Sequence, residues 1–231
     1  MLLHGIAGSR RVFFRAVPLL ARRHRVVVPE LRGEARAVRG FGYDELADDL
    51  AGLLDTLRLD GVTLLGTSFG AAVAMAYAGR GDARVRALLL QGAFSRFRLR
   101  PMDRVAAALG GLLPPSLAAA YFARRVRNGP EAPLVARHAP GCEELLARWS
   151  GETPPRTLRA RIRLIDRRDV ADDLKRARIP VVLARGALDR VVPRACFDAL
   201  VAARPDARAV TWPDAGHLPM LSHPDLFASL L

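Results

Sequence analysis

The sequence predicts an α/β fold with a mostly parallel sheet and helices on both faces, and two observations predict it. First, short and nearly all-apolar stretches alternate with longer stretches of helical periodicity, a pattern typical of parallel strands buried on both sides. Second, the turn Gly66-Thr67-Ser68-Phe69-Gly70 joins the apolar run 62–65 to a segment of small residues. A buried strand, a sharp turn and a helix are therefore expected around Ser68.

The predicted elements alternate before and after a long middle segment. Each predicted strand is an apolar run, and each predicted helix places apolar side chains on one face. The expected elements before the middle segment are a strand at 1–3, a helix at 12–23, a strand at 25–29, a helix at 43–58, the strand and helix around Ser68, and a strand at 85–92. Those after it are a strand at 180–186, a helix at 193–203, a strand at 207–212 and a helix at 224–231.

Residues 95–178 break this alternation. Prolines and glycines punctuate short stretches with helical periodicity, and no strand pattern stands out among them. We therefore predict that 1–94 and 179–231 form one α/β core, and that 95–178 is a helical cap inserted into it. For an apolar cap residue such as Trp149 or Tyr121, core packing and the lining of a substrate pocket both stay open.

Length and composition are those of a globular protein. The chain has 231 residues, of which 51% are hydrophobic and 26% charged. No apolar stretch approaches the roughly 20 residues that span a bilayer, and no secretory leader is recognisable, so we expect a cytoplasmic protein without a membrane partner. Cys142 and Cys196 are far apart and lack metal-ligand spacing. We expect neither a metal nor a cofactor.

The net charge of +13 raises the question of nucleic-acid binding. All basic residues except Lys175 are arginine, and they are scattered along the whole chain. A nucleic-acid interface usually gathers its basic residues on one element and interleaves aromatic residues. We therefore predict no nucleic-acid partner and attribute the arginines to compositional bias, although the charge would attract anionic substrates or acidic partners.

Two residues elsewhere in the chain give Ser68 a chemical context. A serine hydroxyl is a weak nucleophile that needs a base, and the base needs an orienting carboxylate. Asp189 follows the predicted strand 180–186, and His217 follows the predicted strand 207–212. The carboxyl ends of parallel strands meet at one edge of a sheet, so the order Ser68, Asp189, His217 predicts a nucleophile, an acid and a base brought together.

The other histidines and a nearby aspartate are weaker candidates for these roles. His4 lies in a glycine-rich turn, where it would brace the loop rather than act as a base. Asp214 precedes His217 and is better explained as a turn former. The remaining histidines fit ordinary core, surface or helix-capping positions: His24, His138 and His223.

With these motifs the chain resembles the α/β-hydrolase-fold superfamily over nearly its whole length, as a serine hydrolase or carboxylesterase-like member. Residues 66–70 resemble its nucleophile elbow, and residues 186–193 resemble its acid turn. The stretch Pro29-Glu30-Leu31-Arg32-Gly33 resembles the family's loop after its fourth strand. The chain departs from the family by lacking the first two strands. We expect this to leave the strand 25–29 at an exposed sheet edge, through which a second copy could pair, or the start to have been assigned too late.

The resemblance implies a mechanism on these positions. Ser68 would attack an acyl carbonyl, His217 would take and return its proton, and Asp189 would hold the imidazole. The backbone N–H groups of Ile6 and Phe69 would form the oxyanion hole.

The expected function is a serine hydrolase that cleaves a small-molecule carboxylic ester or thioester through an acyl-enzyme on Ser68. Two catalytic alternatives stay open: hydrolysis of a carrier-protein methyl ester, with which the stretch 39–43 bears a faint resemblance, and carbon–carbon bond hydrolysis. A third alternative is a non-catalytic binding member of the same fold. The substrate, its acyl-chain length and the oligomeric state cannot be read from the sequence.

Overall fold

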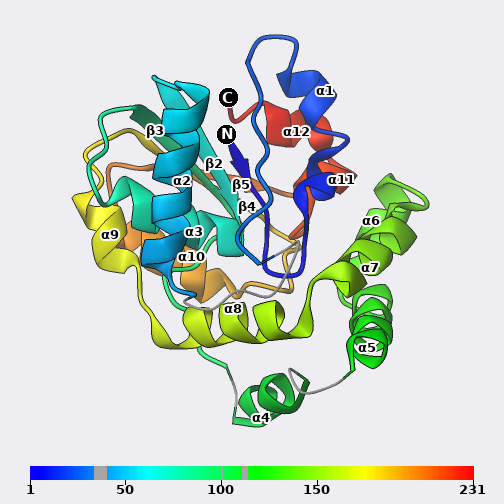
Figure 1. Ribbon diagram of the computed structural model, residues 1–231. Helices are drawn as coiled ribbons and strands as arrows, with labels where there is room; N and C mark the ends of the chain where they lie inside the picture. Colours follow the sequence, from blue (N-terminus) through cyan, green and yellow to red (C-terminus); the bar gives the residue numbers. More distant parts are fainter. Residues whose placement is uncertain (34–40, 100, 111–113) are drawn as a thin grey trace.

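A parallel sheet lies at the centre of the computed structural model, which describes residues 1–33, 41–99, 101–110 and 114–231 (Figure 1). Its described strands are ordered β1-β2-β3-β4-β5, and each is parallel to its neighbours. The bounds are β1 (Leu2–Leu3), β2 (Val62–Thr67), β3 (Val85–Gln91), β4 (Val181–Gly186) and β5 (Arg208–Trp212). The prediction of an α/β fold on a mostly parallel sheet is confirmed.

Alternation along the strands divides the apolar side chains between two faces. Successive strand residues point to opposite sides of a sheet. Leu64 and Leu88 accordingly belong to one buried cluster, whereas their neighbours Leu65 and Leu89 belong to the other. Both faces are therefore buried, which explains why the strands read as continuous apolar runs rather than as alternating ones.

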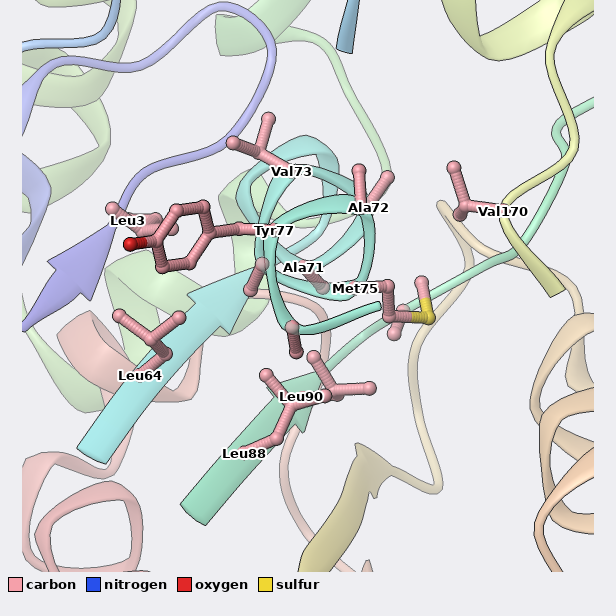
Figure 2. Packing of buried hydrophobic residues seen from close by; sticks show 14 of the residues in the cluster. Leu3, Leu64, Ala71, Ala72, Val73, Met75, Tyr77, Leu88, Leu90 and Val170 are labelled. Atoms are coloured by element: carbon pink, nitrogen blue, oxygen red, sulfur yellow. The ribbon is translucent and has the colours of Figure 1, made fainter. Parts of the chain in front are cut away.

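The first face is covered by one helix before β2, one after β2, the last helix of the predicted cap and the helix after β4. These are α2 (Tyr43–Leu57), α3 (Phe69–Ala78), α9 (Ala171–Arg176) and α10 (Arg194–Ala203). Every residue of α3 is buried, and Figure 2 shows Leu64, Leu88 and Leu90 of the sheet packed against it. Small residues dominate α3 because the helix lies between the sheet and its neighbouring helices.

The second face is covered by short helical pieces from both ends of the chain: η1 (Arg10–Phe13), α1 (Val17–Leu20), α11 (Pro219–Ser222) and α12 (Pro224–Ala228). The prediction of one continuous helix over 12–23 is wrong. Pro18 has no N–H and its ring would clash with the carbonyl of Phe14, so a 3₁₀ turn ends at Phe13 and α1 starts anew at Val17. Pro224 separates α11 from α12 in the same way.

The strand expected at Arg25–Pro29 is not formed. The segment lies beside β1, and the Leu2 N–H donates to the Val27 carbonyl at 2.9 Å. Because β1 is only two residues long, it offers too few backbone groups for a regular ladder on that side. The exposed edge strand that we expected at 25–29 is therefore replaced by an irregular segment next to β1.

The predicted cap contains helices only, as far as its described residues go. They are α4 (Pro101–Gly110), α5 (Pro115–Arg127), α6 (Ala132–His138), α7 (Cys142–Glu152), α8 (Pro155–Arg167) and α9. Figure 1 shows α8 passing across the carboxyl edge of the sheet, with α5, α6 and α7 beside it. Leu174 of α9 packs in the same cluster as α3.

Two further expectations concern the stretch 39–43 and the absence of a membrane-spanning segment. Of the stretch 39–43, positions 39 and 40 lie outside the described residues. None of the helices in the described ranges combines the length and the apolar character that crossing a bilayer requires.

Candidate active site

Ser68 occupies the turn between β2 and α3 in a conformation that side chains rarely adopt. Its φ is 53° and its ψ −117°, a strained combination that typically costs about 1–3 kcal/mol. The flanking glycines make the turn sterically feasible. A Cβ on Gly66 would lie 2.5 Å from the Gly70 carbonyl oxygen, and one on Gly70 would overlap the Leu3 backbone. The strain and the two glycines are those of a nucleophile elbow.

The loop after β1 passes directly beside Ser68. A Cβ on Gly5 would be 3.6 Å from the Ser68 Cβ and 4.0 Å from its Oγ. The preceding His4 is fully buried and receives the Leu31 N–H on Nε2 at 3.1 Å. His4 thus joins this loop to the segment after 29 and lies in a bracing position, as expected. Ile6, the expected second oxyanion donor, is in the same loop.

A buried arginine of the cap contacts both expected oxyanion residues. Arg161 of α8 donates from Nη1 to the Ile6 carbonyl at 2.9 Å and from Nη2 to the Arg32 carbonyl at 3.2 Å. Its guanidinium carbon is 5.3 Å from the centre of the Phe69 ring, within cation–π range. A positive charge therefore lies close to the N-terminus of α3, where the helix dipole is also positive.

Asp189 and His217 are brought into direct contact. His217 Nδ1 is 2.8 Å from Asp189 Oδ2, and the other oxygen of this carboxylate accepts the N–H groups of Val191 and Val192 at 2.8 and 2.9 Å. Both side chains are more than nine-tenths buried. These contacts fix the carboxylate and orient the imidazole, which is the geometry that an acid–base pair of a serine hydrolase needs.

The pKa values of the pair are shifted apart. Burial alone would raise the pKa of Asp189, but the charge of His217, its hydrogen bond and the two backbone N–H groups lower it below its usual value. Burial alone would lower the pKa of His217, but the charge of Asp189, their hydrogen bond and the charge of Glu131 raise it. Each of the two residues therefore stabilises the charged form of the other.

Strand β3 connects the serine to the histidine. The Ser68 N–H donates to the Gln91 carbonyl at 2.9 Å, and Gln91 Nε2 donates to the His217 carbonyl at 3.2 Å. Gly92 follows with a φ of 54°, and a Cβ there would lie 2.9 Å from both Cε1 and Nδ1 of His217. Gln91 is fully buried. Gln91 at the end of β3 is thus hydrogen-bonded to the main chain of both Ser68 and His217.

A glutamate of the cap that sequence analysis missed reaches the same place. Glu131, directly before α6, accepts the His217 backbone N–H at 2.6 Å on Oε2 and is itself buried. Burial raises its pKa, and the neighbouring His217 offsets part of that effect. Neither Glu131 nor Arg161 belongs to a motif, so only their depth in the structure reveals them. A buried polar residue ending an apolar strand, as at Gln91, was a readable clue.

The residues that were weaker candidates for a catalytic or metal-binding role make other contacts. His138 and His223 pack ring against ring with centroids 4.3 Å apart, and His223 Nδ1 is 2.9 Å from the Ser222 hydroxyl oxygen. Cys142 and Cys196 are both free thiols. Among the described residues, no group of three or more His, Cys, Asp or Glu side chains is placed to hold a metal ion.

Comparison with protein families assigns the fold. The model of the alpha/beta hydrolase family matches residues 1–230. The chain belongs to the alpha/beta hydrolase family. Its similarity to solved structures agrees: an enol-lactonase from Burkholderia xenovorans LB400 superposes with a TM-score of 0.87 at 22% identity, covering 99% of this chain and 87% of that one. At that identity the likeness shows the fold alone.

Similar α/β-hydrolases include proteins named as esterases. A pimeloyl-[acyl-carrier protein] methyl ester esterase from Aromatoleum aromaticum is 31% identical over 245 residues, or 100% of this chain and 95% of that protein. One from Neisseria meningitidis serogroup B (strain H44/76) is 27% identical over 238 residues, or 99% and 89%. A thermophilic esterase structure from Thermogutta terrifontis has a TM-score of 0.80 at 27% identity, with 99% and 86% covered. The expectation of a hydrolase that acts on ester bonds is confirmed.

Proposed function

We propose that this α/β-hydrolase cleaves a carboxylic ester or thioester through an acyl-enzyme on Ser68. One observation carries the proposal: the buried Asp189–His217 hydrogen bond is tied through Gln91 to a serine held at positive φ. Strained backbone of this kind persists where a function requires it, and here it presents the half-buried Ser68 as a nucleophile.

The mechanism follows from the charges of these residues. Ser68 Oγ attacks the acyl carbonyl while His217 accepts the hydroxyl proton, and the resulting imidazolium is stabilised by the Asp189 carboxylate. The N–H groups of Ile6 and Phe69 bind the negative oxygen of the tetrahedral intermediate, close to the positive N-terminus of α3. His217 then returns the proton to the leaving alcohol or thiol. Water, deprotonated by His217, releases the acid.

A fluorophosphonate probe and an aryl ester test this proposal together. The activity of the wild-type protein should fall in proportion to the phosphonate bound and reach zero at one phosphonate per protein, with the label on Ser68. Ser68→Ala should fold and resist labelling. Its remaining rate should be roughly 10³–10⁴-fold above the uncatalysed hydrolysis in water, because substrate binding and the oxyanion hole are retained. Ser116→Ala, on the exposed start of α5, is the matched control and should label as the wild type does. A folded wild-type protein without label would point to the non-catalytic binding role instead.

The similar proteins favour a carrier-protein methyl ester as the substrate within this class. Two of them carry that name and match nearly the whole chain. Exposed arginines on α5 and α8, including Arg124, Arg125 and Arg163, would attract an acidic carrier. Rates on a methyl ester of a carrier-bound acid should then exceed those on the free acid's methyl ester and should fall with added salt. Equal rates that do not depend on salt would favour a free small-molecule ester.

A further inference from the structure

Among the described residues of the predicted cap, Glu131 is the carboxylate that contacts the candidate active site. It stands at the N-cap position of α6, and its main-chain carbonyl accepts the Val135 N–H at 2.9 Å. Its side chain turns away from the helix, makes no capping bond, and reaches the loop after β5. A carboxylate that gives up the helix N-terminus, where anions are favoured, must find stronger partners elsewhere.

The loop after β5 is shaped to admit this carboxylate. A Cβ on Gly216 would overlap Glu131 Oε2 and would approach Leu134 Cδ2 to 2.7 Å, so a side chain directly before His217 would displace the Glu131 carboxylate from its present position. Oε2 then accepts the His217 N–H at 2.6 Å. Oε1 is buried and has no hydrogen-bond partner in the described part of the chain. Burial raises the pKa of this carboxylate and outweighs the backbone N–H groups of His217 and Arg190, which both lower it, so the carboxylate is poorly solvated.

We propose that Glu131 is a positioning residue of the active site, whose buried carboxylate holds the His217 backbone and sets a second negative charge beside the imidazole. The inference rests on the proposed function for its catalytic consequence. Its geometric part stands on the contacts alone. Asp189 fixes the imidazole through Nδ1, and Glu131 fixes the same residue through its main chain. Through Glu131, the cap contacts the core at His217, the candidate catalytic base.

The two carboxylates act on His217 in the same electrostatic sense. The charged groups that face His217 are Asp189 and Glu131, and those that face Glu131 are His217 and Asp189. Both negative charges favour the imidazolium that forms when Ser68 loses its proton. The neutral imidazole is the catalytic base, so the acid limb of kcat/KM follows the His217 pKa of the free enzyme. Removing the Glu131 charge should move that limb to lower pH.

Glu131→Gln and Glu131→Ala separate charge from position. Glutamine keeps an oxygen that can accept the His217 N–H but carries no charge. We expect this variant to shift the acid limb of kcat/KM to lower pH and to lose less of its plateau kcat than Glu131→Ala does. Alanine removes the acceptor as well, and a displaced base can cost about 100-fold, so kcat itself should fall. Glu144→Gln is the control, because it removes a cap carboxylate that pairs with exposed Arg127 and should change neither quantity.

NMR titration of the His217 ring tests the same inference without any turnover. His217→Gln assigns its resonance among the five histidines. The pKa of His217 should be lower in Glu131→Gln than in the wild type and unchanged in Glu144→Gln. Unchanged titration and an unchanged acid limb in a folded Glu131→Gln protein would overturn the inference, and this variant decides even if Glu131→Ala does not fold. If the wild-type protein is not labelled by the phosphonate, the proposed function is wrong, but the titration still tests whether Glu131 acts on His217.

Discussion

Gly92 illustrates how much a single missing side chain determines at the residue scale. It has a φ of 54°, and a Cβ would lie 2.9 Å from the His217 ring and 3.5 Å from Asp189 Oδ2. The ring cannot move away without losing its hydrogen bond to Asp189. A residue that takes no part in chemistry thereby decides where the candidate base lies.

Gly92→Ala should impair catalysis more than folding. The left-handed backbone costs alanine roughly 1–2 kcal/mol, and a displacement of the imidazole of up to an ångström can cost about 100-fold in rate. Gly81→Ala is the matched control. It has a similar φ of 75°, but nothing lies within 4 Å of the added Cβ. Thermal unfolding should report similar losses for both variants, and kcat/KM on an aryl ester should fall for Gly92→Ala alone. Equal activities would contradict this account.

The candidate catalytic residues can be predicted from the sequence, but the residues that contact and support them cannot. Ser68, Asp189 and His217 follow apolar runs, and this placement is readable because parallel strands end at a common edge. Glu131 and Arg161 act through contacts between segments far apart in the chain, and no local pattern encodes such contacts. Their burial is what distinguishes them from the many solvated charges of this sequence.

At the scale of an element, helix α8 supports the loop that carries the expected oxyanion donor Ile6. Arg161 of this helix donates a hydrogen bond to the Ile6 carbonyl. Ile6 is the residue whose N–H we expect to bind the oxyanion. The loop after β1 is short and glycine-rich, so without such support its N–H would be poorly directed. Preorganised donors are what make an oxyanion hole effective.

Arg161→Met should therefore lower kcat while leaving KM largely unchanged. We expect a loss smaller than the roughly 10²–10³-fold that removal of an oxyanion donor itself costs, because Ile6 keeps its N–H. Arg163→Met, on the exposed side of the same helix, is the control and should match the wild type. Single-turnover kinetics on an aryl ester would separate the acylation step from binding. A change in KM alone would show that Arg161 acts on substrate binding instead.

The elements that sequence analysis placed wrongly share one physical cause. The helix expected at 12–23 is interrupted at Pro18, and the strand expected at 25–29 lacks a long enough partner in β1. Apolar periodicity is present in both segments, but backbone hydrogen bonding decides whether an element forms. Strands with full-length neighbours, such as β2 and β3, were predicted to within two residues.

At the scale of the whole molecule, the buried carboxylate of Glu131 links folding to pH. Its pKa is raised by folding, mainly through burial. A group whose folded pKa lies above the unfolded value contributes its full stability below the unfolded pKa, about 4.3 for glutamate, and loses it as pH rises through the folded value. Ionised Glu131 is thus a cost to the fold above that range.

Glu131→Gln should therefore gain melting temperature relative to the wild type as pH rises from 4 to 8. Glu144→Gln should show the opposite trend. Arg127 lowers the pKa of Glu144, so the wild-type ion pair is present at neutral pH and lost in acid. Calorimetry of the three proteins across this range measures both slopes. Parallel curves for Glu131→Gln and the wild type would mean that the Glu131 carboxylate is as well solvated as in the unfolded chain.

The two buried cap charges set a rule for building chimeras in this family. Caps from other α/β-hydrolases are natural material for changing substrate range, because the helices of the cap that we predict lie between β3 and β4 in the chain. A grafted cap without counterparts of Arg161 and Glu131 would leave the Ile6 carbonyl and the His217 N–H without their present partners. Such a graft could fold well and still be inactive. Transplanting these two positions together with their backbone contacts should be the first step in any such exchange.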